Sequence, residues 1–179
     1  MSDHEPTDTT RIAAMVIGVL ALVVVGALVA RSMKPVRANL PAAQEVSTAA
    51  TGTSPITGKR TTLAALTGKP VVLTIWASWC PGCNEEAPHL SKVAATRSDV
   101  HFFGIDYRDN ADDAGDFVTK YGWSMPTVED PFGTIANGLG LQGTPTTIFL
   151  DANHREVGRV VGAMDQDGLE DAIDQLVGA

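Results

Sequence analysis

Two cysteines, Cys80 and Cys83, are the side chains best suited to chemistry, and they are the only cysteines in the 179-residue chain. Only Pro81 and Gly82 separate them. A thiolate at a helix N-terminus is stabilised by free N–H groups and by partial positive charge. In a helix the second sulfur lies about one turn from the first, close enough to resolve a mixed disulfide. The spacing therefore predicts thiol–disulfide exchange, with two buried structural cysteines as the alternative.

The segments around the pair predict a junction between a strand and a helix. Val71–Trp76 is a continuous β-prone run, which is typical of a strand buried on both faces. A helix is expected from the cysteines to about Thr96, and Pro81 suits its first turn because no N–H is needed there. Cys80 is thus expected at the helix N-terminus.

The remaining sequence predicts an α/β domain with a central mixed sheet flanked by helices. His101–Asp106 reads as a second central strand, and Asp112–Tyr121 as a helix ended by Gly122. Thr146–Leu150 and Glu156–Val161 are expected to pair as a hairpin around residues 151–154. A final helix is predicted from the helical spacing of Leu169, Ala172, Ile173, Leu176 and Val177.

The N-terminal part divides into three segments ahead of this domain. Residues 1–11 form a polar tail, and residues 12–30 form an uncharged apolar run of a length that can cross a bilayer. We expect a transmembrane anchor there, with a cleaved signal as the alternative. Residues 31–55 are rich in Ala, Pro, Ser and Thr and predict a linker, so that the domain covers residues 56–179.

Charge and composition exclude several classes of protein. The net charge of −8 argues against nucleic acid or anionic lipid as the main partner. A single Cys pair supports neither a disulfide framework nor a structural zinc site. The four histidines, His4, His89, His101 and His154, have no ligand spacing. The sequence predicts no metal, no bound cofactor and nothing larger than a monomer.

Three motifs carry a resemblance to a known family. Trp76–Ala–Ser–Trp79–Cys80–Pro–Gly–Cys83 resembles the active-site segment of thioredoxins. Cys83–Asn–Glu–Glu86–Ala–Pro88 resembles the TlpA/ResA/DsbE-like branch, and Gly143–Thr144–Pro145–Thr–Thr–Ile–Phe–Leu–Asp resembles the loop and strand that carry the cis-proline of that fold. The resemblance covers about residues 58–178. It implies a thioredoxin-like fold, here preceded by one transmembrane helix.

The resemblance also implies roles for the cysteines and one acid. Cys80 would be the attacking thiol and Cys83 the resolving thiol, while Glu86 would be the active-site acid that tunes the thiols or moves a proton. From its position alone, Glu86 could equally be a solvated acid in the first turns of a helix, where acids are favoured.

Substrate contacts follow from the same resemblance. Pro145 would be cis and would place the backbone of Thr144 beside the sulfurs, to pair with a substrate strand; without the resemblance it is an ordinary loop proline. Trp79, Pro81 and Gly82 would complete the substrate-binding surface.

Two departures from thioredoxin leave the direction of electron flow open. Thr74 stands six residues before Cys80, where many thioredoxins carry a buried Asp, so Glu86 or water would have to accept protons. Pro81–Gly82 also reverses the Gly-Pro order of thioredoxin. Neither reductant nor oxidant follows automatically.

The expected function is extracytoplasmic exchange of a Cys80–Cys83 dithiol or disulfide with envelope or exported proteins. A TlpA/ResA-like reductase, including cytochrome c maturation, is the first interpretation, and a DsbE-like oxidant is the second. A copper-binding metallochaperone is the third, with His154 a poor third ligand. A separate membrane protein would recycle the thiols. The flanking charges conflict with this placement, because Arg31, Lys34 and Arg37 follow the apolar run and only Arg11 precedes it.

Overall fold

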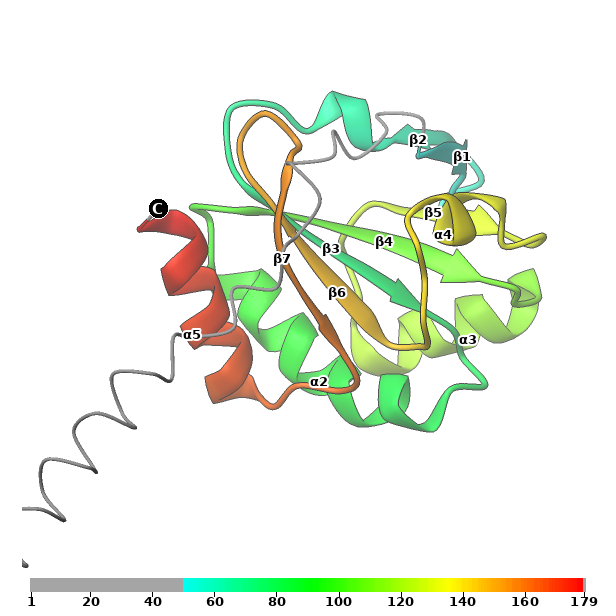
Figure 1. The fold of residues 1–179 in the computed structure, drawn as a ribbon. Coiled ribbons are helices and arrows are strands. Elements are labelled where there is room, and N and C mark those ends of the chain that lie inside the picture. The colour runs from blue at the N-terminus through cyan, green and yellow to red at the C-terminus, as the bar shows by residue number, and fades with distance from the viewer. Residues whose placement is uncertain (1–49, 179) are drawn as a thin grey trace, which may run out of the picture. The chain divides into compact units, whose positions relative to one another are not determined.

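The computed structural model describes residues 50–178, and a five-stranded mixed sheet forms its centre (Figure 1). The strand order is β5-β4-β3-β6-β7. β3 and β4 are parallel, as are β4 and β5, whereas β6 runs antiparallel to both β3 and β7. The strands are β3 (Val71–Trp76), β4 (His101–Tyr107), β5 (Thr127–Asp130), β6 (Thr146–Leu150) and β7 (Glu156–Val161). The predicted mixed sheet and hairpin are confirmed.

Helices cover both faces of this sheet (Figure 1). Three longer helices lie on one face: α2 (Pro81–Thr96), α3 (Ala111–Tyr121) and α5 (Gln166–Val177). The other face carries a short 3-10 helix, η1 (Leu63–Ala65), and the short helix α4 (Thr134–Gly138). A two-stranded antiparallel sheet, β1 (Thr51–Thr53) with β2 (Arg60–Thr62), precedes η1.

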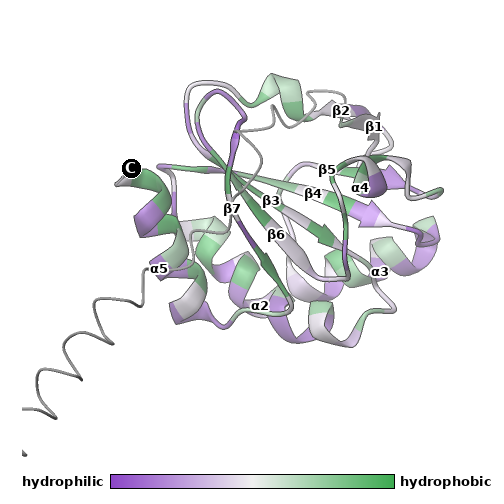
Figure 2. Cartoon of the chain, viewed as in Figure 1, coloured by the Kyte–Doolittle hydropathy of each residue, from purple (hydrophilic) through white to green (hydrophobic). Residues whose placement is uncertain are grey.

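The central strand β3 is buried at every position, as its continuous β-prone run predicts. Its alternate residues face the two layers, and Trp76 faces the layer of α2 and α3. The Trp76 ring stacks on Phe117, with 4.5 Å between the ring centroids, and lies 5.2 Å from Trp123. Figure 2 shows the hydrophobic colour running along β3 and the hydrophilic colour on parts of the outer helices. Trp76 is therefore a core residue of the domain.

Local signals fix the helix ends. Asn110 caps α3, since its side chain accepts a hydrogen bond from the Asp113 N–H, and Gly122 ends that helix with a left-handed φ of 62°. Asp165 caps α5 by accepting from the Gly168 N–H at 2.9 Å. The caps of α3 explain why its predicted limits, Asp112–Tyr121, are nearly those observed.

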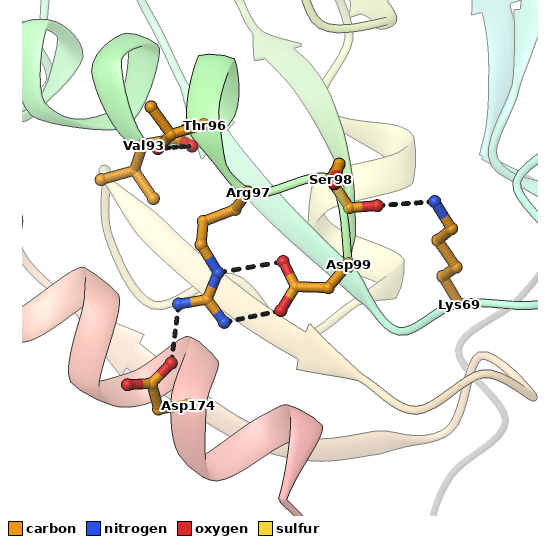
Figure 3. A network of polar contacts seen from close by, with 7 residues as sticks. All are labelled: Lys69, Val93, Thr96, Arg97, Ser98, Asp99 and Asp174. Carbon is orange, nitrogen blue, oxygen red and sulfur yellow. Dashed lines mark hydrogen bonds and ion pairs between the residues drawn. The ribbon is translucent and has the colours of Figure 1, made fainter.

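An arginine at the C-terminal end of α2 connects that helix to α5 (Figure 3). Arg97 pairs with Asp99 at 2.8 Å and with Asp174 of α5 at 2.7 Å. Both carboxylates are well exposed, so each pair contributes no more than about 1 kcal/mol. Lys69 donates to the Ser98 carbonyl oxygen beside this network. The network fixes the far end of α2, away from the cysteines.

The structure corrects the sequence analysis in four places. Ala50 is buried and Thr51–Thr53 forms a strand, so these residues, predicted as part of the linker at residues 31–55, are packed in the domain. β5 and α4 were not predicted, because β5 ends in two acids and α4 has only five residues. Tyr107 belongs to β4, one residue beyond the expected end. Val177 was expected on the packed face of α5, but it is 46% exposed because it lies at the end of the helix.

The predicted transmembrane segment, residues 12–30, lies outside the described residues. Among residues 50–178, no helix is both long and apolar enough to cross a membrane.

Candidate active site

Cys80 occupies the N-cap position of α2, directly after the turn that follows β3. Its Sγ accepts a hydrogen bond from the backbone N–H of Cys83 at 3.2 Å. Both cysteines are free and buried, with exposed fractions of 3% and 2%. A sulfur that receives an amide N–H at a helix start is stabilised as a thiolate. The predicted placement of the pair at the strand-to-helix junction is confirmed.

The two thiols have different surroundings. Burial is the main factor that raises the pKa of Cys83 far above its ordinary value, and the hydrogen bond with Cys80 raises it further. Cys83 is therefore held as a neutral thiol and needs a proton acceptor before it can attack. This asymmetry is what an exchange reaction with one attacking and one resolving thiol requires.

Glu86 lies one turn after Cys83 and is buried, with an exposed fraction of 2%. Burial raises its pKa to about 7, although a hydrogen bond from the Met164 N–H, at 3.3 Å, acts in the opposite direction. The charge of Glu86 in turn raises the pKa of Cys83. The neighbouring Glu85 is exposed. The alternative interpretation of Glu86 as a solvated helix acid is therefore wrong.

The loop before β6 packs against the cysteine motif. The Thr144–Pro145 peptide bond is cis. A Cβ placed on Gly82 would lie 3.1 Å from Pro145 Cδ and 3.7 Å from the Ala163 Cβ, so Gly82 allows the loop to approach closely. Pro145 thus lies close to Gly82, and it is cis, as the family resemblance implied.

A hollow of about 210 Å³ opens beside this contact. Trp79 forms part of its wall and is 56% exposed, and its Nε1 donates to the Arg108 carbonyl oxygen at 3.2 Å. Thr144 also lines the hollow, so the structure brings together two of the predicted substrate-contact residues. The other lining residues are Tyr107, Asn137, Leu141, Gln142 and Gly143.

The sequence analysis missed a second buried acid. Asp106 is 2% exposed, and burial, followed by the charges of Asp109 and Glu129, raises its pKa to about 8. It lies one residue before the end of β4, opposite Trp76 at the end of the parallel strand β3. Ligand and reactive groups gather at the carboxyl ends of parallel strands, and this rule could have found it. Thr74, buried at 1%, offers no ionisable group in its place.

Three further polar residues around the motif also escaped the sequence analysis. Ser78, Asn84 and Asp109 form side-chain hydrogen bonds that hold the turn before Cys80. Ser78 and Asn84 lie within the quoted motifs and Asp109 lies in none, and only the fold shows that the three residues meet.

The copper-binding interpretation finds no third ligand in the part of the chain that the structure describes. No group of three or more His, Cys, Asp or Glu side chains within residues 50–178 is arranged to hold a metal ion. His154 is buried, and its Nε2 lies 2.5 Å from the Leu66 carbonyl oxygen.

Comparison with known proteins agrees with this geometry. The chain is 37% identical over 115 residues to the soluble secreted antigen MPT53 of Mycobacterium tuberculosis, covering 63% of this chain and 66% of that protein. It is 32% identical over 109 residues to the thiol:disulfide interchange protein DsbE of Pseudomonas aeruginosa, covering 60% of this chain and 59% of that protein. The chain thus spans less than two thirds of the length of both relatives.

Solved structures give the same result. A secreted disulfide oxidoreductase of M. tuberculosis, homologous to E. coli DsbE, superposes with a TM-score of 0.62 at 34% identity and covers 72% of this chain and 93% of the other. M. tuberculosis DsbF superposes with a TM-score of 0.65 at 31% identity, covering 70% and 93%.

The mixed sheet, the cysteine pair at the start of α2 and the cis-proline beside it define a thioredoxin-superfamily protein of the DsbE/TlpA-like type. This is a class of thiol–disulfide oxidoreductases. The chain belongs to the Redoxin family, whose profile matches residues 39–176.

Proposed function

We propose that this protein exchanges its Cys80–Cys83 dithiol or disulfide with protein substrates outside the cytoplasm. The first candidate function is that of a TlpA/ResA-like reductase. The observation that carries the exchange reaction, in either direction, is the hydrogen bond from the Cys83 N–H to the Cys80 Sγ, with the buried carboxyl of Glu86 one turn further along α2. It combines a stabilised nucleophile, a second thiol held neutral and a group that takes up protons near pH 7.

In the reductive direction, the Cys80 thiolate attacks one sulfur of a substrate disulfide. A mixed disulfide forms, and the other substrate sulfur leaves as a thiolate that takes a proton from solvent. Cys83 then attacks the Cys80 sulfur while its proton passes to Glu86, and the second substrate sulfur leaves as a thiolate that takes a proton from solvent. Glu86 later returns its proton to solvent. The substrate gains two electrons, and the protein is left with a Cys80–Cys83 disulfide.

The product of this reaction requires a second protein. The disulfide must be reduced again by a two-electron donor, and we assign this task to a separate membrane redox protein that carries its own cofactor. The substrates are disulfides of envelope or exported proteins, including cytochrome c maturation substrates. They would lie across the hollow, with the exposed Trp79 on one side and the Thr144 backbone on the other.

Oxidation of substrate thiols, the opposite direction of electron flow, is the second candidate function. The hydrogen bond from the Cys83 N–H to the Cys80 Sγ favours it. A hydrogen bond that stabilises the Cys80 thiolate stabilises the reduced protein, and a protein with a stable reduced form is an oxidant. The substrate thiols would then give two electrons to the Cys80–Cys83 disulfide.

The proposed location is the outer side of the cell membrane, with residues 12–30 as a single-pass anchor. The apolar length of this segment supports an anchor. The name of the mycobacterial relative, a secreted antigen, supports the extracytoplasmic side. The positive residues Arg31, Lys34 and Arg37 argue for the opposite orientation. Protease protection of the tagged C-terminus in intact cells would separate the two.

The reduction potential of the full chain in detergent, measured against a glutathione series, tests the function. A reduction potential of about −270 mV marks a reductant, and a potential of about −120 mV marks an oxidant. Cys83→Ser is expected to accumulate a mixed disulfide, and Cys80→Ser is expected to form none. If the wild-type protein forms no reversible disulfide, the proposal is wrong; tight Cu(I) binding by the reduced protein would then support the metallochaperone interpretation.

A further inference from the structure

The turn that joins β3 to α2 is held by the segment that follows β4. The backbone N–H of Ser78 donates to Asp109 Oδ2 at 2.5 Å, and the Ser78 hydroxyl donates to Asp109 Oδ1 at 2.9 Å. The next residue in the turn, Trp79, donates its indole N–H to the Arg108 carbonyl oxygen at 3.2 Å. Two consecutive residues after β4 therefore bind the two residues that precede Cys80.

The same turn is held from the side of α2 by Asn84. Its Nδ2 donates to the carbonyl oxygens of Ser78 and Cys80, at 2.8 Å and 3.0 Å. Its Oδ1 accepts from the Tyr121 hydroxyl at 2.9 Å, which fixes the orientation of the amide. The N–H, hydroxyl and carbonyl groups of Ser78 are thus all bonded to side chains of other elements.

The backbone of Arg108 has an unusual conformation at this point. Its φ is 51°, one of two positive φ values among the non-glycine residues within residues 50–178. Residues other than glycine are held in this region only where the surroundings enforce it, and such residues cluster at functional sites. The Arg108 N–H is bonded to the Asp130 carbonyl oxygen at 3.0 Å. The bend allows both the Arg108 carbonyl and the Asp109 carboxylate to meet the turn.

We propose that Asp109 is a positioning residue of the exchange reaction, which acts through Ser78 to hold Cys80 at the start of α2. The inference rests on the proposed function, because it assigns the position of the same nucleophile. Asp109 bonds to the turn and not to a sulfur. By fixing Ser78, it fixes the path of the chain into Cys80, so that the sulfur meets the Cys83 N–H. A misplacement of about 1 Å in a reacting atom can cost about 100-fold in rate.

An alternative is that the Asp109 carboxylate acts by its charge alone, and the choice of variants separates the two. Asp109→Asn removes the charge but keeps the shape, one acceptor for the Ser78 N–H and one donor for the Ser78 oxygen. Asp109→Ala removes the charge, both hydrogen bonds to Ser78 and the one that Oδ1 accepts from the Asn110 N–H at 3.0 Å. Ser78→Ala removes only the hydroxyl bond. Asp116→Ala removes an exposed acid from α3 and is the matched control.

The experiment measures the reaction of the full reduced chain with glutathione disulfide, and the alkylation of Cys80 by iodoacetamide in the Cys83→Ser background. We expect Asp109→Ala to lower both rate constants about tenfold and Ser78→Ala about threefold, while Asp109→Asn stays within about twofold of wild type. The equilibrium constant with glutathione is expected to change in Asp109→Ala and to be restored in Asp109→Asn. Thermal unfolding of each variant checks the fold, and Ser78→Ala carries the test if Asp109→Ala does not fold.

Several outcomes would overturn the inference. If Asp109→Asn changes the rates as much as Asp109→Ala, the charge and not the hydrogen bonds is responsible. If folded Asp109→Ala reacts like the control Asp116→Ala, the contact has no role in the reaction. If Asp109→Ala does not fold, the same conclusion follows when folded Ser78→Ala reacts like wild type. Failure of the proposed function would look different, since the wild-type protein itself would form no reversible disulfide.

Discussion

Glu86 and Met164 are joined by a hydrogen bond, with 3.3 Å between the backbone nitrogen of Met164 and Oε1 of the carboxyl group. Glu86 belongs to α2, whereas Met164 precedes α5, so the bond connects two elements far apart in the sequence. It stabilises the charged form of Glu86, but burial has the larger effect and the pKa is raised to about 7. Glu86 therefore changes its protonation state near neutral pH.

Replacing Glu86 by Gln is expected to slow the second exchange step, in which Cys83 must lose its proton. General-base catalysis is worth about 100-fold or more, so the rate of Cys80–Cys83 disulfide formation should fall by about that factor at pH 7. The rise in rate near pH 7 should disappear. Rapid-mixing fluorescence across pH 5 to 9 measures both, and Glu85→Gln, which changes an exposed neighbour, is the control. An unchanged pH profile would remove Glu86 from the reaction.

Stability should decrease as the pH rises, because two buried acids hold their protons in the folded state. The pKa of Glu86 is raised from 4.5 to about 7, and that of Asp106 from 3.8 to about 8. Between the ordinary and the raised pKa of each acid, the unfolded chain has released a proton that the folded chain still binds. The free energy of unfolding therefore falls with pH across this window and levels off above it. Glu86→Gln should reduce the loss in the free energy of unfolding between pH 4 and pH 8 by no more than about 3 kcal/mol.

Asp106→Asn provides an independent test of the same linkage. The variant should reduce the loss of stability between pH 4 and pH 8 by at least about 1 kcal/mol, measured by urea unfolding at both values. The acids around Asp106 that raise its pKa are Asp109, Glu129 and Asp130. If Asp106→Asn shows the wild-type dependence on pH, Asp106 is ionised in the folded protein.

Gly104→Ala should be strongly destabilising. A Cβ at this position in β4 would lie 2.6 Å from Thr127 Oγ1 and 3.0 Å from Trp76 Nε1, inside the buried layer. We expect a loss of about 2–4 kcal/mol in the free energy of unfolding, because the core must shift. Gly115→Ala in α3, where no atom lies within 4 Å of the new Cβ, should stabilise by up to about 1 kcal/mol. Urea denaturation of the pair gives the comparison, and equal effects would contradict the close packing.

Trp79→Ala should separate substrate binding from folding. Because Trp79 is 56% exposed, the stability should change by less than about 1 kcal/mol, whereas kcat/KM for a protein disulfide should fall about tenfold. The control is Val157→Ala on β7, which is 46% exposed and lies outside the hollow. The rate at which each variant reduces the disulfide of a protein substrate measures the effect. Equal rates for the two variants would place substrate binding elsewhere.

The elements that position the cysteines could be predicted because each has a strong local signal. Val71–Trp76 is a continuous apolar run, Pro81 marks a first helical turn, and Gly122 takes the left-handed conformation of a helix end. Short elements had no such signal. β1 and β5 have only three and four residues, and tertiary contacts rather than residue preferences determine where they form.

Only those site residues that lie within recognisable motifs could be predicted from the sequence. The cysteines and Pro145 lie within recognisable strings, and their placement in the structure agrees. Asp106 and Asp109 lie in no motif; their importance depends on burial and on which loops meet at the ends of β3 and β4. The pKa of Glu86 likewise follows from burial by α5 and the segment before it, which no local pattern of α2 reveals.

The sulfur of Cys80 both attacks the substrate and forms the cap of α2. A disulfide sulfur is a weaker hydrogen-bond acceptor than a thiolate, so the hydrogen bond from the Cys83 N–H should weaken when Cys80 is oxidised. We therefore expect the first turn of α2 to lose part of this N-terminal cap on oxidation. The Cys83 amide should report the oxidation state directly, exchanging its hydrogen with solvent faster in the disulfide form, and a redox partner could read the same difference in the backbone.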